Sequence, residues 1–312
     1  MSRILIAGLP RTGTTWLAQI VGSAPGVTLV SEPDNSEVEP LAFVLTRRIG
    51  PFPYPPPGER HIDYRLVWAF AFAGGWPDHE RLDAIRRRIL KVRVPRAIKA
   101  TAYTSVAWVA SKKAPVSKHQ VVKAVLGAHA IEWIAHEFDP RVVVVWRHPF
   151  NIVPAWQDRG WPRLPPSDAV RARFEGTAVW PPPTEKGVGA IAWRACAESI
   201  RLLEVVDRHK DWTLVAHEEQ CLDPPAAFHR LFDRLGLEWS EEVRQRLEVS
   251  DRPGKDYVTN RVAADEPLRW KSRLDAAQQD EVRSVMDLFE QVSPIAAATW
   301  RSSPAVRSDL AR

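Results

Sequence analysis

The sequence predicts an α/β fold in which a parallel sheet is flanked by helices. Short continuous apolar runs alternate with helical patterns, as expected of parallel strands that are buried on both faces. A second observation is the glycine-containing stretch "GLPRTGTTW", which lies between the first apolar run and an amphipathic segment. Strand, glycine loop and helix in this order form a phosphate-binding arrangement, so we expect a sheet of the P-loop type.

Five apolar runs are the predicted strands. The clearest of them is "VVVVW" at residues 142–146, and the first is bounded directly by Gly8. After the loop, apolar residues recur at helical spacing from Trp16 to Val21, and the pattern stops at Gly22. In chain order, the predicted strands are residues 4–7, 27–30, 121–122, 142–146 and 213–215.

Two proline-rich inserts, at residues 36–118 and 157–188, interrupt this pattern. They contain "GPFPYPPPGER" and "WPPPTEKG", which are too rich in proline for regular helix. Long inserts in an α/β domain often form lids, so we expect a lid over an acceptor site, with surface filler as the alternative. The chain then forms one domain over residues 1–300 and a disordered tail over residues 301–312.

Composition limits the classes of partner. The 312 residues are 45% hydrophobic and 26% charged, which is typical of a soluble globular protein. A formal charge of +5 suits a small anionic ligand and is too weak to indicate nucleic acid. Two cysteines form no disulfide framework, and no apolar run approaches the roughly 18 residues of a membrane span. We expect a cytoplasmic protein without nucleic-acid or membrane partners.

The loop has the glycines of a nucleotide site but not its lysine. In the ATP- or GTP-binding loop a lysine precedes the final hydroxyl residue, whereas Thr14 occupies that position here. The basic residue comes earlier, as Arg11. Backbone amides at residues 12–15 remain suited to a phosphate at the helix N-terminus. The sequence therefore disfavours a kinase and indicates a different nucleotide.

The stretch "PRTGTTW" resembles the 5'-phosphosulfate loop of sulfotransferases that use 3'-phosphoadenosine 5'-phosphosulfate (PAPS). That loop reads Pro, Lys or Arg, Ser or Thr, Gly, Thr, Thr, Trp, and all positions match. The resemblance implies transfer of a sulfuryl group from PAPS to a hydroxyl or amine of a small-molecule or carbohydrate acceptor, with the product PAP and no metal. It implies cofactor binding by Pro10, Arg11, Thr12, Gly13, Thr14, Thr15 and Trp16.

Arg11 is the candidate for activating the donor. The resemblance places a basic residue beside the oxygen that bridges phosphate and sulfate. A guanidinium is always protonated and a poor proton donor, so Arg11 would act by stabilising the charge that develops on the leaving phosphate.

A second anchor follows the clearest strand, in "VVVVWRHPFN". Arg147 comes just past the carboxyl end of that strand, where open α/β sheets bind ligands. In the sulfotransferases an Arg here and a Ser eight residues later hold the 3'-phosphate. Arg147 matches, whereas the serine is replaced by Ala155, and Pro154 is expected to distort the helix there. The missing hydrogen bond is worth about 1 kcal/mol. A surface arginine at a strand end is the alternative.

Glu32, in "LVSEPDN", is the first candidate for the base that takes the acceptor proton. It follows the second predicted strand and resembles the Glu-Pro segment of carbohydrate-type and bacterial sulfotransferases, whose glutamate is the base. His129 and His136 lie at helical spacing and are rival bases, ranked below Glu32 because a helical histidine is more often structural.

Lys123, in "VVKAVLG", resembles the Lys-Asp-Pro segment of bacterial members, although Ala124 and Val125 replace the last two residues. The resemblance implies a contact with the sulfate. A solvated lysine at a strand end is an equally good interpretation.

Two downstream segments extend the resemblance. Residues 214–239 resemble a structural strand-turn-helix block, with His217 and Gln220 as departures. "LRWKSRL" resembles the closing Trp-Lys-x-x-Leu segment, which implies that Trp270 stacks on adenine and that Lys271 or Arg269 meets the 3'-phosphate. A tryptophan that belongs to the core is the alternative.

Other readings stay open. A non-catalytic PAP- or PAPS-binding relative is favoured by Ala155 and Ala124, and a P-loop kinase is the less favoured rival. The sequence identifies neither the acceptor nor the oligomeric state, for which a homodimer is one option.

Overall fold

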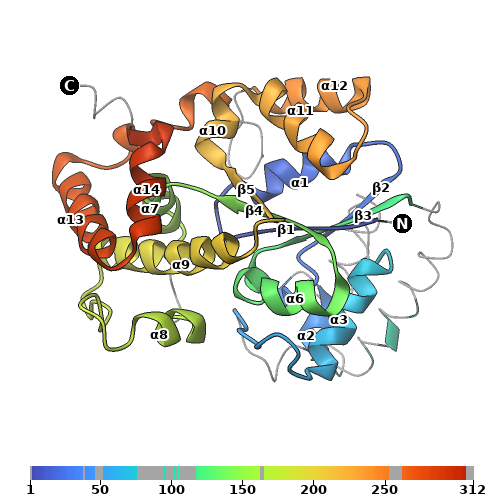
Figure 1. Cartoon of the computed structure of the whole chain (residues 1–312), viewed down its shortest axis with the longest axis horizontal. Coiled ribbons are helices and arrows are strands. Elements are labelled where there is room, and N and C mark those ends of the chain that lie inside the picture. Colours follow the sequence, from blue (N-terminus) through green and yellow to red (C-terminus); the bar gives the residue numbers. More distant parts are fainter. Residues whose placement is uncertain are drawn as a thin grey trace. The chain divides into compact units, whose positions relative to one another are not determined.

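In the computed structural model, the described residues are 2–37, 39–45, 52–75, 95, 98, 101–102, 105, 117–161, 165–252 and 262–306. Within these residues, five parallel strands form one sheet in the order β2-β3-β1-β4-β5, flanked by helices (Figure 1). The predicted α/β class is confirmed. The strands are β1 (Ser2–Gly8), β2 (Val27–Ser31), β3 (His119–Ala124), β4 (Arg141–Trp146) and β5 (Thr213–Ala216).

All five predicted strands are present, each longer than its apolar run, and β3 has six residues where the predicted run has two. β1 is the central strand, and its residues from Ile4 to Ala7 are fully buried. Continuous apolar sequence is typical of a strand covered on both faces, as β1 is, and such runs located the strands without an alternating pattern. In the register, Lys123 of β3 pairs with Ile6 of β1 and with Ser31 of β2.

The helices connect these strands. Among the described residues, no helix is long and apolar enough to cross a membrane. The α-helices are α1 (Thr14–Gly22), α2 (Pro40–Leu45), α3 (Ile62–Phe72), α6 (Ile131–Phe138), α7 (Pro149–Gln157), α8 (Asp168–Phe174), α9 (Val188–Arg208), α10 (His217–Leu222), α11 (Pro224–Leu235), α12 (Glu241–Ser250), α13 (Ala276–Val292) and α14 (Pro294–Ser302). Short 3₁₀ turns are η2 (Leu126–His129), η3 (Ala263–Asp265) and η4 (Arg269–Ser272).

The chain forms two compact units. The first comprises Met1–Ala7, Thr14–Val143 and Phe232–Val243. The second comprises Gly8–Gly13, Val144–Leu231 and Arg244–Arg312. The prediction of one domain over residues 1–300 stays a prediction.

An aromatic core holds α3 against α6 in the first unit. Tyr64 of α3 lies 5.2 Å from Trp133 of α6 between ring centroids, and Phe72 lies 5.4 Å from Phe138. The buried Trp68 belongs to the same core, so it is unavailable to stack on an acceptor. Figure 1 shows α3 beside α6.

Regular helix occurs inside both proline-rich inserts, so the expectation that they exclude it is wrong. In the first insert, α3 runs for 11 residues through a stretch that lacks proline, because the prolines cluster at residues 51–57 and resume only at Pro77. In the second, Pro165 and Pro166 precede the N-cap Ser167, whose hydroxyl accepts a hydrogen bond from Val170 N at the start of α8.

The lid itself stays a prediction. The first insert has residues 38, 46–51, 76–94, 96–97, 99–100, 103–104 and 106–116 outside the described part of the chain, and the second has residues 162–164 outside it. Of the predicted tail, residues 307–312 also lie outside it, whereas Ala305 is fully buried.

Pro154 does not end α7, and the expected distortion of the helix stays a prediction. The helix begins at Pro149 and continues through Pro154 to Gln157. Pro154 has no N–H, so α7 lacks one internal hydrogen bond at this position and must accommodate the proline ring against the carbonyl of Phe150. Ala155 is helical, and it is 6% exposed.

Candidate active site

The carboxyl end of each strand carries a candidate polar residue or, in the case of β1, the candidate phosphate-binding loop. The carboxyl ends of strands are where open α/β sheets bind ligands. The residues divide into two groups, one in each compact unit. In strand order from β1 to β5, they are the loop from Gly8 to Gly13, Glu32, Lys123, Arg147 and His217.

The loop backbone after β1 is fixed by its own contacts within the second unit. Thr12 is 1% exposed, and its hydroxyl donates to Leu9 O at 2.8 Å. Trp156 of α7 donates from Nε1 to Pro10 O at 2.8 Å. Arg11 and Gly13 have positive φ, 70° and 94°. Arg11 pays a conformational cost in this left-handed region, and such strain is a common feature of functional sites.

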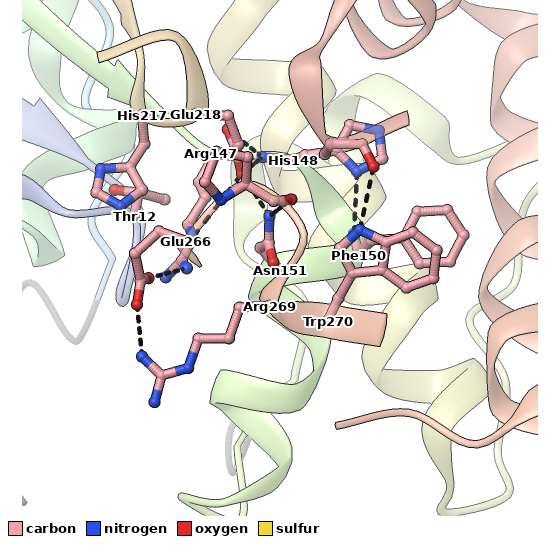
Figure 2. A network of polar contacts seen from close by, with 12 residues as sticks. Thr12, Arg147, His148, Phe150, Asn151, His217, Glu218, Glu266, Arg269 and Trp270 are labelled. Atoms are coloured by element: carbon pink, nitrogen blue, oxygen red, sulfur yellow. Dashed lines mark hydrogen bonds and ion pairs between the residues drawn. The ribbon is translucent and has the colours of Figure 1, made fainter. Parts of the chain in front are cut away.

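Arg147 binds this loop from the end of β4. Its Nη1 donates to Arg11 O at 3.1 Å. Its Nη2 donates to Glu266 Oε2 at 2.7 Å (Figure 2). Arg147 is 9% exposed, so the alternative of a surface arginine is wrong. The structure therefore brings the two predicted phosphate-binding segments, the loop and the end of β4, into direct contact.

Two buried carboxylates surround the Arg147 guanidinium. Glu218 is fully buried and accepts hydrogen bonds from His148 N and Asn151 Nδ2, while its Oε1 lies 3.9 Å from Arg147 Nε. Burial raises the pKa of Glu218, although Arg147 and these donors oppose the rise. Burial also favours a higher pKa for Glu266, but Arg147 and other nearby positive groups outweigh it and hold that pKa below its ordinary value.

An unfilled donor remains on Arg147. Its Nε is buried and has no hydrogen-bond partner among the described residues. An orphaned donor on a buried cation fits an additional anionic oxygen. Together with the positive φ of Gly13, which suits a loop whose amides bind an anion, this group fits a phosphate.

His217 packs against the loop after β1, although the sequence marks it only as a departure from the sulfotransferase block. It begins α10 directly after β5 and is 7% exposed. A Cβ added at Gly13 would lie 2.7 Å from His217 Cε1 and still closer to Nδ1. The imidazole thus packs on the loop backbone. Burial and the charge of Arg147 lower the pKa of His217 to about 3, so the ring is neutral. In the sequence, its position just after a predicted strand could have indicated that it lies near the loop.

In the first unit, Glu32, Lys123 and Thr15 come together. Lys123 Nζ forms an ion pair with Glu32 Oε1 and lies 3.3 Å from Thr15 Oγ1. Asn35 Nδ2 donates to the other Glu32 oxygen at 2.6 Å. Lys123 is 3% exposed, so its interpretation as a solvated lysine is wrong. Glu32 has a left-handed φ of 51°, the same kind of strain as at Arg11.

Asp34 is a buried carboxyl that the sequence analysis missed. It lies two residues after Glu32 and is 5% exposed, and its Oδ2 accepts a hydrogen bond from Tyr64 at 3.1 Å. Its Oδ1 is buried without a hydrogen-bond partner among the described residues. Burial raises the pKa of Asp34 to about 7. No sequence pattern marks Asp34, because its burial depends on α3 from the proline-rich insert.

The two histidines considered as rival bases lie in different environments. His129 ends η2 and is 4% exposed. His136 lies on α6 with an exposed side chain, and its Nδ1 is 3.5 Å from Glu137 Oε1. Their assignment as bases stays a prediction.

Trp270 has the surroundings of a core residue. It is 1% exposed, stacks on Phe150 with ring centroids 4.3 Å apart, and donates from Nε1 to Ala305 O at 3.1 Å. Lys271 Nζ lies 5.5 Å from the Trp270 ring centre. Stacking of Trp270 on adenine and a phosphate contact by Lys271 stay predictions.

No protein-family model matches the chain, and no curated protein sequence does either. Solved sulfotransferase structures do align with it. The sulfotransferase domain of the Synechococcus PCC 7002 olefin synthase is 14% identical, with a TM-score of 0.46 over 93% of this chain and 94% of that one. The sulfotransferase domain from the curacin biosynthetic pathway is 11% identical, with a TM-score of 0.49 over 92% and 96%.

Mouse sulfotransferase SULT7A1, solved with PAP, is 11% identical, with a TM-score of 0.49 over 97% of this chain and 89% of that one. The chain is thus similar to sulfotransferases over most of its length, and at identities and scores this low its function must be argued from its own residues.

Proposed function

We propose that the chain transfers a sulfuryl group from PAPS to a hydroxyl or amine of a small-molecule or carbohydrate acceptor. The observation that carries the proposal is the contact between Arg147 and Arg11 O, which joins the loop "PRTGTTW" to the arginine at the end of β4. Arg11 lies on the loop and Arg147 contacts it, so two positive charges are available to a nucleotide with a second phosphate group. Thr14 stands where the loop of a kinase has its lysine.

Pro10 to Trp16 bind the 5'-phosphosulfate in this proposal. Arg11 supplies a fixed positive charge beside the bridging oxygen and stabilises the leaving phosphate. Arg11 is exposed at the surface of the loop. Arg147 binds the 3'-phosphate, and its orphaned Nε supports this role.

Glu32 is the proposed base, and Lys123 contacts the sulfate. A new bond joins the sulfur to the acceptor oxygen or nitrogen, and the bond from sulfur to the bridging oxygen breaks. The acceptor proton passes to Glu32, and PAP leaves with the electron pair of the broken bond. Lys123 and Asn35 orient the Glu32 carboxylate, as the partners of a catalytic base do. The chemistry uses no metal.

A non-catalytic PAP-binding protein is the second candidate. It is favoured by the same ion pair, because a carboxylate held by Lys123 and Asn35 is a weaker base than a free one. A cytoplasmic location and a homodimer remain predictions from the sequence.

Equilibrium binding and an acceptor screen test the proposal. Calorimetric titration with PAP is expected to give micromolar or tighter binding, while ATP with magnesium binds more weakly. Labelled PAPS is then incubated with pools of alcohols, phenols, amines and sugars, and labelled product is expected from at least one pool. PAP binding without transfer to any acceptor favours the second candidate. Preference for ATP with turnover contradicts both and favours a kinase.

A further inference from the structure

We propose that Glu266 is a built-in competitor of the donor nucleotide, whose carboxylate occupies an anion site formed by Arg147 and Arg269 until a 3'-phosphate displaces it. This inference rests on the proposed function and adds to it a residue that sets affinity and selectivity for the 3'-phosphate.

The carboxylate bridges two guanidiniums. Glu266 Oε2 lies 2.7 Å from Arg147 Nη2, and Oε1 lies 2.5 Å from Arg269 Nη1. Figure 2 shows Glu266 between the two arginines, with a contact to each. Two arginine forks around one anion form the arrangement with which proteins bind phosphate oxygens. The geometry is therefore that of an anion site whose present occupant is an internal carboxylate.

The site is partly open on one side. The Glu266 and Arg147 side chains are 8% and 11% exposed, whereas Arg269 is 38% exposed. Glu266 itself lies between two short 3₁₀ turns, η3 and η4, rather than in a long helix or strand. In the proposal the carboxylate moves aside, and Arg147, which follows the buried end of β4, stays in place.

A phosphate is the stronger ligand for this pair of arginines. Near neutral pH a phosphate monoester carries between one and two negative charges and three acceptor oxygens, against one charge and two oxygens for a carboxylate. Arg147 also retains a buried Nε without a hydrogen-bond partner among the described residues, which a third oxygen would satisfy. In the proposal a 3'-phosphate takes over the contacts of Glu266 with Arg147 and Arg269 and adds a contact with Arg147 Nε.

While Glu266 occupies the anion site, the 3'-phosphate cannot bind there. The apparent affinity for the nucleotide therefore equals the intrinsic affinity multiplied by the fraction of molecules in which the site is free. Removing its charge should strengthen binding of ligands that have a 3'-phosphate. Ligands with only a 5'-phosphate should be unaffected, because they do not use this site. Structural damage alone would not produce this difference between two ligands.

The test compares PAP with adenosine 5'-monophosphate by calorimetry on the full chain. Glu266→Gln is expected to bind PAP about tenfold more tightly or better, with the monophosphate affinity changed by less than about twofold. Glu198→Gln is the matched control, since Glu198 forms another buried pair with an arginine, Arg194. That control should leave both affinities unchanged. Glu266→Asp, which shortens the reach of the carboxylate, is expected to give a smaller gain and serves if the glutamine variant does not fold.

The outcomes separate this inference from the proposed function. If the unsubstituted chain binds PAP and neither Glu266 variant binds it more tightly, the inference is wrong and the function stands. An equal gain for both ligands also overturns it. PAP binding that appears only in a Glu266 variant supports the inference. Failure of every variant to bind PAP contradicts the proposed function, and the inference with it.

Discussion

Arg147 at the end of β4 donates a hydrogen bond from Nη1 to the backbone carbonyl of Arg11, over 3.1 Å. The two arginines are 136 residues apart in the sequence. Because the acceptor is a backbone atom, this hydrogen bond positions the loop and does not depend on the Arg11 side chain. The guanidinium thus has a positioning role in addition to its proposed contact with the 3'-phosphate.

Arg147→Lys tests this dual role. A lysine keeps the charge but cannot bind Arg11 O and Glu266 together with a planar fork. We expect PAP affinity to fall by at least about tenfold, from the loss of a charge-assisted hydrogen bond. Calorimetry measures it, and urea unfolding reports the accompanying loss of stability. Unchanged affinity for PAP would show that Arg147 contacts no phosphate.

Arg11→Ala separates the loop backbone from the loop charge. The contact with Arg147 uses the backbone carbonyl of Arg11, so the alanine variant should keep this contact. Loss of one group that stabilises the transition state costs about 3 kcal/mol. We therefore expect turnover to fall about a hundredfold, measured with labelled PAPS and an acceptor from the screen. Arg11→Lys, as the control, should retain more activity, and full activity in the alanine variant would refute the role.

Glu32→Gln is expected to lower turnover by about a hundredfold or more, since it removes the proposed base and keeps the side-chain shape. Steady-state kinetics measure the effect. Glu238→Gln, at an exposed position without a proposed role, is the control and should be fully active. The ranking of the bases is reversed if Glu32→Gln is active and His129→Ala is not.

Asp34→Asn should change how stability depends on pH. Burial raises the pKa of Asp34 from 3.8 to about 7, so the folded state holds a proton that the unfolded state releases. Its contribution to stability is complete below pH about 4 and is lost as pH rises through about 7. We expect the unsubstituted chain to lose about 3 kcal/mol more than Asp34→Asn between pH 5 and pH 8. Urea unfolding at both pH values measures this, and parallel pH profiles would show that Asp34 titrates normally.

The effect of Gly13→Ala on the free energy of unfolding should depend on whether His217 is present. An added Cβ overlaps the imidazole, and the φ of 94° disfavours any side chain. The left-handed conformation alone costs about 1 to 2 kcal/mol, and the overlap adds to it. In Gly13→Ala with His217→Ala the overlap disappears, so the two substitutions should be less destabilising together than the sum of their separate effects. Urea unfolding of all four proteins gives the coupling, and strict additivity would contradict the contact.

Much of the fold was predictable because local sequence determines it. Continuous apolar runs located all five strands, and the end of each strand pointed to Glu32, Lys123 and Arg147. The proline-rich inserts were harder, since a few clustered prolines obscured the helical segments between them, α3 and α8.

The sequence did not predict the network of charged residues around Arg147. Glu266 is 119 residues from Arg147, and nothing in its neighbourhood marks it as the partner. The burial of Asp34 likewise depends on Tyr64, 30 residues away. Buried ion pairs and shifted pKa values depend on tertiary packing, which motif and periodicity do not encode.

Transfer of radiolabelled sulfate from PAPS tests the central claim most directly. The chain, the Arg11→Ala variant and a sample without protein are each incubated with labelled PAPS and the acceptor pools, and with labelled ATP and magnesium in parallel. We predict labelled product from PAPS that falls about a hundredfold in the variant, and no product from ATP. Product from ATP, with none from PAPS in any pool, would contradict the account.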